Sequence, residues 1–168
     1  ALPSAAKPSA ASAKARFWDR IAPKYATDPI ADLAGYEATL QRVQGLLSPQ
    51  HDVLEIGCGT GSTALRLAPF TRSLLATDVS SQMIDIAHQR LAAQPSPALR
   101  FAVADAEAMA PGPEVYDAVL AFNVLHLMTD LDDALRQLVK VLRPGGLLIS
   151  KTACVAEMNP LIPYLAVP

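Results

Sequence analysis

The sequence contains few cysteines, little net charge and no long apolar run. Its two cysteines supply neither a disulfide framework nor the spacing of a metal site, so we expect no bound metal and a reducing, cytoplasmic setting. The formal net charge of −2 creates no electropositive field that would attract a nucleic-acid backbone. No apolar run reaches the roughly 18 residues that a membrane-spanning helix needs. These absences argue against disulfide-stapled, nucleic-acid-binding and membrane-spanning proteins.

The composition instead predicts one folded domain with a flexible end. Hydrophobic residues make up 51% of the 168 residues and charged residues 18%, which is ample material for a buried core. Residues 1–15 contain only Ala, Ser, Pro, Lys and a single Leu, a composition that can bury very little. We therefore divide the chain into a flexible tail over 1–15, a helical segment over 16–50, a core over 51–153 and a Pro-rich C-terminal segment over 154–168.

The core alternates between strand-like and helix-like stretches. Apolar runs of strand length occupy 52–56, 73–77, 99–104, 116–121 and 146–151. Helical spacing of apolar residues occupies 60–68, 80–93 and 130–142. Strands this uniformly apolar, alternating with helices, predict an α/β fold whose parallel sheet is covered on both faces, of the doubly wound class. Before the core we expect one helix over 15–22 that Pro23 ends, and another that starts at Asp28-Pro29.

A glycine-rich turn follows the first strand. Gly57, Gly59 and Gly61 alternate with other residues, which lets the backbone turn tightly and approach a ligand without a Cβ in the way. The alternative to a ligand-binding loop is a plain glycine-rich turn that only connects the strand to the next helix. The spacing differs from the G-x-G-x-x-G pattern of dinucleotide-binding proteins. Glu55 at the strand end would repel a pyrophosphate and attract an ammonium group, so the pattern favours a ligand with a cationic amino-acid end.

The segment VLEIGCGTG over 53–61 resembles the first motif of class I S-adenosylmethionine-dependent methyltransferases. The resemblance covers residues 16–153 and implies a Rossmann-like sheet with strand order 3-2-1-4-5. The segment FWDRIAPKY over 17–25 also resembles the N-terminal lid helix of small-molecule methyltransferases, including those of quinone biosynthesis. The helical segment 16–50 would then be a lid over the cofactor.

The resemblance implies a set of cofactor contacts at the strand tips. Asp78 would accept hydrogen bonds from both ribose hydroxyls, although it could instead cap the next helix. Asp105 and the Ala106 amide would meet the adenine, and Tyr25 would close over the methionine part, unless it only packs with Trp18. The implied cofactor-binding residues are Tyr25, Glu55, Gly57, Cys58, Gly59, Gly61, Asp78, Val79, Met83, Asp105, Ala106 and Asn123.

The expected reaction is transfer of the cofactor's methyl group, with S-adenosylhomocysteine as product. His126, beyond the fourth strand, is the best candidate for a general base if the acceptor must lose a proton, and a pocket wall otherwise. The sequence AFNV over 121–124 lacks the Asn-Pro-Pro-Tyr type of motif found in enzymes that methylate nucleobase amines or glutamine. This difference favours a small or lipid-like acceptor.

Two alternatives stay open. A nicotinamide-dependent oxidoreductase shares the sheet and the acid at the second strand tip, but the glycine spacing and Glu55 disfavour it. A non-catalytic S-adenosylmethionine-binding domain gains weight because the family's usual sixth and seventh strands are absent from this chain. We expect the polypeptide to continue beyond Pro168, or the edge of strand 147–151 to be covered by the 154–168 segment or by a second subunit in a homodimer.

Overall fold

A computed structural model describes residues 10–108 and 116–152 of the chain. They form one parallel sheet with the order β3-β2-β1-β4-β5, so the predicted Rossmann-like strand order is confirmed. The strands are β1 (Asp52–Ile56), β2 (Ser73–Asp78), β3 (Leu99–Val103), β4 (Tyr116–Phe122) and β5 (Leu142–Lys151). Within the described ranges, β3 and β5 form the two edges of the sheet. No helix there is both long and apolar enough to cross a bilayer.

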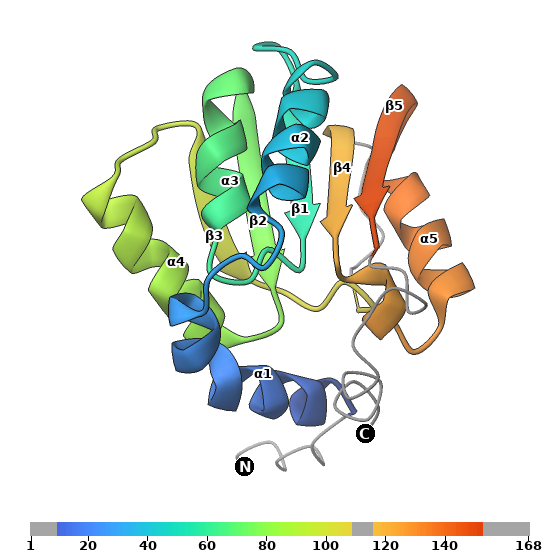
Figure 1. The fold of residues 1–168 in the computed structure, drawn as a ribbon. Helices are drawn as coiled ribbons and strands as arrows, with labels where there is room; N and C mark the ends of the chain where they lie inside the picture. Colours follow the sequence, from blue (N-terminus) through green and yellow to red (C-terminus); the bar gives the residue numbers. More distant parts are fainter. Residues whose placement is uncertain (1–9, 109–115, 153–168) are drawn as a thin grey trace, which may run out of the picture.

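Helices cover both faces of this sheet, as the uniformly apolar strands predict. One face packs against α2 (Leu33–Gln44), α3 (Ser62–Leu67) and α4 (Ser81–Ala93), and α2 and α3 lie in front of the strands in Figure 1. The other face packs against α5 (Leu131–Lys140) through Leu138 and the neighbouring Val141. Alternate residues of β1 join the two cores, because successive side chains of a strand point to opposite faces.

The N-terminal helices differ from the sequence prediction. The first, α1 (Ala10–Thr27), begins earlier than expected and continues through Pro23. A proline inside a helix costs about 3 kcal/mol. Packing outweighs that cost here, because α1 lies along α4 and buries Ala22 completely. The start expected at Asp28-Pro29 is also wrong: Asp32 caps α2 by accepting a 2.9 Å hydrogen bond from the Gly35 amide.

The remaining boundaries differ by only a few residues, except at β5. There the pairing with β4 begins at Leu142, is interrupted by a register shift and resumes at Leu147. Residues 1–9 of the expected tail and all of the expected 154–168 segment lie outside the described residues. The homodimer through the β5 edge therefore stays a prediction.

Helix α1 occupies a distinct position. Figure 1 shows it crossing below the carboxyl ends of the strands, whereas α2 and α3 run alongside the strands. In parallel α/β sheets, ligands bind at this edge, where the strand order reverses between two neighbouring strands. Here β1 and β4 are those neighbours, with β2 and β3 on one side and β5 on the other. Of the predicted lid segment 16–50, α1 thus lies at the expected binding edge, whereas α2 covers a face of the sheet.

Candidate functional site

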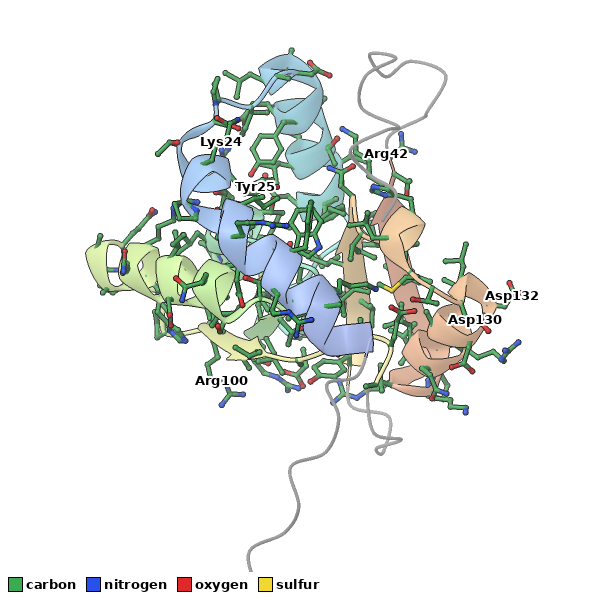
Figure 2. The ribbon with its side chains drawn as sticks, turned by 90° about the horizontal axis from the view of Figure 1, so that it is seen from below. Lys24, Tyr25, Arg42, Arg100, Asp130 and Asp132 are labelled. Carbon is green, nitrogen blue, oxygen red and sulfur yellow. The ribbon has the colours of Figure 1, made fainter. Side chains whose placement is uncertain are left out.

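A cleft of about 440 Å³ lies between the strand tips and α1. Figure 2 looks onto it from the α1 side, with Tyr25 close to the end of that helix. Most of the residues predicted to bind a cofactor line it together: Tyr25, Glu55, Gly57, Cys58, Gly59, Asp78, Val79, Met83, Asp105, Ala106 and Asn123. The structure therefore gathers residues from the tips of β1, β2, β3 and β4 into one space.

The glycine loop forms the floor of this cleft. Gly57, Gly59 and Gly61 have φ angles of +63°, +54° and +78°, a conformation that residues with a Cβ rarely adopt. A Cβ on Gly57 would overlap the side chain of Val124, and one on Gly59 would lie 3.5 Å from the Tyr25 ring. The Cys58 amide donates a 2.9 Å hydrogen bond to the Thr77 carbonyl, which fixes the loop to β2.

Gly61 serves packing instead. It is not among the residues that line the cleft, and a Cβ there would lie 2.5 Å from Cζ of Phe101. Its left-handed backbone lets α3 start close against β3 and α4. A sequence pattern cannot separate this role from ligand contact, because both need a glycine at the same place.

Two carboxylates line the cleft near the glycine loop. Glu55 is buried, and its Oε2 has no hydrogen-bond partner among the described residues. Burial and the nearby Asp78 raise the pKa of Glu55 to about 8. Asp78 accepts 2.9 Å hydrogen bonds from the Gly59 and Ser80 amides. Burial raises its pKa, although these amide hydrogen bonds act in the opposite direction.

Asp78 is not a helix cap. Ser80 caps α4, because its hydroxyl accepts a 3.1 Å hydrogen bond from the Met83 amide. The capping alternative considered for Asp78 is therefore wrong. Asp78 accepts backbone hydrogen bonds from Gly59, Val79 and Ser80, and a carboxylate has about four acceptor positions, which leaves room for a ligand hydroxyl.

The rest of the rim comes from the lid and from the tips of β3 and β4. Tyr25 is about half exposed at 52%, and burial together with Asp78 raises its pKa. Asp105 accepts a 2.9 Å hydrogen bond from the Glu107 amide, which shapes the turn after β3. Asn123 has a positive φ of 53°, and its amide donates a 2.7 Å bond to the Lys151 carbonyl.

The structure does not bring His126 to the site. It lies on the short helix η2 (Leu125–Leu127), is exposed and is not among the cleft-lining residues. Its neighbours Leu127 and Met128 line the cleft instead. The geometry thus gives the general-base hypothesis no support.

Sequence reasoning missed Arg90, which lines the cleft from α4. Its guanidinium donates 2.6 Å hydrogen bonds to the hydroxyls of Thr60 and Ser62, and a 3.0 Å bond to the Ala26 carbonyl. Arg90 therefore holds the end of α1 against the glycine loop. No local pattern marks an arginine in the last turn of a helix as a link between two distant segments.

The comparisons with known proteins agree with this geometry. Residues 53–146 match the family described as methyltransferase domain. The non-reducing polyketide synthase dpmpA of Macrophomina phaseolina is 35% identical over 147 residues, 79% of this chain and 6% of that protein. The methyltransferase GfsG of Streptomyces halstedii is 33% identical over 122 residues, 71% of this chain and 44% of that protein. The crystal structure of the [4+2]-cyclase SpnF is similar with a TM-score of 0.73 and 25% identity, over 86% of this chain and 61% of that one.

This chain spans less than half the length of the two sequence relatives. The matched family region nevertheless extends from β1 into β5, and so contains the glycine loop and the tips of β1 to β4. On this evidence the chain belongs to the class I S-adenosylmethionine-dependent methyltransferase family.

Proposed function

We propose that this chain binds S-adenosylmethionine in the cleft and transfers its methyl group to a small, largely apolar acceptor. The observation that carries the proposal is the buried Glu55 oxygen without a described partner, beside a glycine loop at the reversal of strand order. An unpaired polar atom in such a position is costly unless a ligand satisfies it. A cationic amino group would pair with the Glu55 carboxylate, whereas the negative charges of Glu55 and Asp78 would repel a phosphate.

Each part of the cofactor has residues of matching chemistry. Glu55 would hold the ammonium group, and Asp78 would accept hydrogen bonds from the ribose hydroxyls. Asp105 and the Ala106 amide lie at the β3 tip, where they would meet the adenine. Val79 and Met83 also line the cleft and would supply apolar contact. The residues present therefore fit this cofactor.

When bound, the cofactor supplies a sulfonium methyl group, which passes to a nucleophile in line with the breaking carbon–sulfur bond. The protein's part is to align the acceptor and exclude water. Such positioning is worth about 7–11 kcal/mol of barrier in well-oriented systems. Tyr25 and α1 cover the cleft, and Arg90 holds the end of α1 through its hydrogen bond to the Ala26 carbonyl.

Part of the cleft lining favours an apolar acceptor. Ile30, Phe122, Leu127 and Met128 are among the residues that line the cleft, and Ile30 is 47% exposed. Apolar lining of this kind contributes binding energy when a hydrophobic molecule covers it. The similarity to a polyketide synthase and to GfsG supports a small-molecule acceptor as well. The quinone-biosynthesis branch and the cytoplasmic setting remain predictions.

A specific observation favours a second candidate, a domain that binds the cofactor without transferring methyl groups. SpnF, with the same fold and 25% identity, is described as a [4+2]-cyclase. Membership in this fold therefore does not by itself require methyl transfer. Both candidate functions require binding of the cofactor, but only the first includes transfer of its methyl group.

The test combines binding and turnover. Isothermal titration with S-adenosylhomocysteine is expected to show saturable one-to-one binding, while NADH under the same conditions shows none. Radiolabelled S-adenosylmethionine is then incubated with a panel of apolar phenols, enols and amines. Binding with methyl transfer supports the proposal, and binding without transfer across the panel supports the second candidate. Tight binding of NADH, or no binding of S-adenosylhomocysteine, contradicts both candidate functions.

A further inference from the structure

One carboxylate joins three separate segments around the cleft. Glu107, in the turn after β3, forms an ion pair with Lys14 near the start of α1. The same carboxylate accepts hydrogen bonds from the Thr129 amide at 2.6 Å and the Asp130 amide at 3.3 Å. Asp130 caps α5, and Figure 2 shows it at that helix, on the side away from Tyr25. Glu107 thus connects the lid, the β3 tip and the start of α5.

All three connected segments border the ligand space. Lys14, Asp105 with Ala106, and Met128 line the cleft, each from one of them. The Lys14 and Glu107 side chains are only 27% and 20% exposed. Burial would raise the pKa of Glu107, but the hydrogen bonds from Lys14, Thr129 and Asp130 outweigh it, and the pKa is lowered. The carboxylate is therefore ionised at neutral pH.

Two other attachments hold α1 further along its length. Asp19 accepts bonds from the Ser80 hydroxyl at 2.6 Å and the Gln82 amide at 3.1 Å, and Arg90 holds the Ala26 carbonyl. Those two attachments tie α1 to α4. The Lys14–Glu107 pair crosses from α1 to the β3 tip and the start of α5. Opening this pair would remove that connection, while the Asp19 and Arg90 attachments further along α1 remain.

We propose that Glu107 is a positioning residue, a clasp that fixes the lid helix and the 128–130 segment against the adenine side of the cleft and so slows ligand release. The inference rests on the proposed function for the identity of the ligand. The clasp itself is a property of the ligand-free chain. Glu107 does not line the cleft and is not expected to touch the cofactor.

Graded substitutions separate the arms of the clasp. Glu107→Gln keeps an oxygen that can accept from the Thr129 amide but loses the charge that holds Lys14, whereas Glu107→Ala loses both. We expect S-adenosylhomocysteine to dissociate about three- to tenfold faster from Glu107→Gln in stopped-flow displacement, and more than about tenfold faster from Glu107→Ala. Glu37→Gln is the matched control, because it breaks the exposed Glu37–Arg66 ion pair away from the cleft. It should leave the dissociation rate unchanged.

A double substitution tests whether Lys14 acts through Glu107. Lys14→Met should raise the dissociation rate as much as Glu107→Gln does, and the double variant should match either single variant, since all three lack the same ion pair. Added salt should speed release from the wild type and have little effect on these variants. Additive effects would mean that Lys14 contacts the ligand itself, and would overturn the clasp. Unchanged release from Glu107→Ala would do the same.

A ligand-free measurement keeps the result independent of the proposed function. In the wild type, the Thr129 and Asp130 amides should be protected from hydrogen exchange. Glu107→Gln should keep part of this protection, and in Glu107→Ala the two amides should exchange about tenfold faster than in the wild type. If the wild type binds no S-adenosylhomocysteine, the proposed function fails while this exchange pattern still supports the clasp. Equal exchange in all variants overturns the clasp whether or not the ligand binds.

Discussion

Replacing Glu55 with glutamine tests the charge balance at the centre of the cleft. The wild-type carboxyl is buried, with one oxygen unpartnered among the described residues and Asp78 close by. Its pKa is raised to about 8 from a usual value of 4.5. The side chain is therefore mostly protonated and neutral in the free protein at pH 7. Glutamine has nearly the same shape and stays neutral at every pH.

The size of the effect follows from proton linkage. A carboxyl with a raised pKa holds its proton in the folded state while the unfolded chain has already released it. The contribution to stability is therefore fully present below about pH 4.5 and is lost as the pH rises towards 8. One pKa unit corresponds to about 1.4 kcal/mol, so the wild type should lose about 3 kcal/mol between pH 5 and pH 8 through this group. Glu55→Gln should not show this loss.

Urea denaturation from pH 5 to pH 8 measures it, with Trp18 fluorescence as the signal. The quantity to compare is the free energy of unfolding of the variant minus that of the wild type, because the contributions of all other titrating groups cancel in this difference. It should grow with pH, whereas the same difference for Glu37→Gln, an exposed carboxyl with a lowered pKa, should not. A difference that stays flat for Glu55→Gln would show that the buried group is ionised in the free protein, and would refute the reasoning.

The same variant connects stability to binding. An ammonium group that pairs with Glu55 needs the ionised form, so ligand binding at pH 7 should release about one proton. Titration calorimetry in buffers of different ionisation heat reports this release. Glu55→Gln should abolish it and weaken S-adenosylhomocysteine binding about 10- to 100-fold. Wild-type affinity in the variant would remove Glu55 from the ligand site.

Three further substitutions test single residues of the site. Asp78→Ala should lower cofactor affinity about 10²- to 10³-fold in titration calorimetry and leave the fold intact, because two charge-assisted hydrogen bonds to ribose are lost; unchanged affinity contradicts the ribose assignment. His126→Ala should retain full turnover, because the side chain is exposed and outside the cleft; a loss of about 10² or more in rate would restore the general-base hypothesis. Gly61→Ala should lower the free energy of unfolding by about 1–3 kcal/mol through its positive φ and the overlap with Phe101, with any loss of affinity following that loss of folding.

Local chemistry made the main features of the site predictable. The strands β1 to β4 are short and mostly apolar, which indicates buried parallel strands without any knowledge of their partners. Glu55 and Asp78 lie at the carboxyl ends of β1 and β2, and Gly57 and Gly59 follow β1. Parallel strands bring their carboxyl ends to one edge of the sheet. Their convergence in one cleft therefore follows once the strand order is known.

The bounds of α1 and α2 could not be predicted in the same way. Pro23 argues for a helix end in any local reading, yet α1 continues through it because α4 packs along its side. Asp28-Pro29 has the pattern of a helix start, but Asp28 instead accepts a 2.6 Å hydrogen bond from Lys24. These outcomes depend on contacts between segments that are far apart in the sequence.

The sequence by itself determined the α/β fold class, the glycine loop and the acids at the strand tips, since each rests on residues a few positions apart. The strand order was implied by the family resemblance. Only the tertiary structure decided which of these residues face the cleft: it directs Gly61 into packing and leaves His126 outside. It also brings in Arg90 and Glu107, whose partners lie up to 93 residues away along the chain. Such contacts form only when distant elements pack together, so a local pattern carries no signal for them.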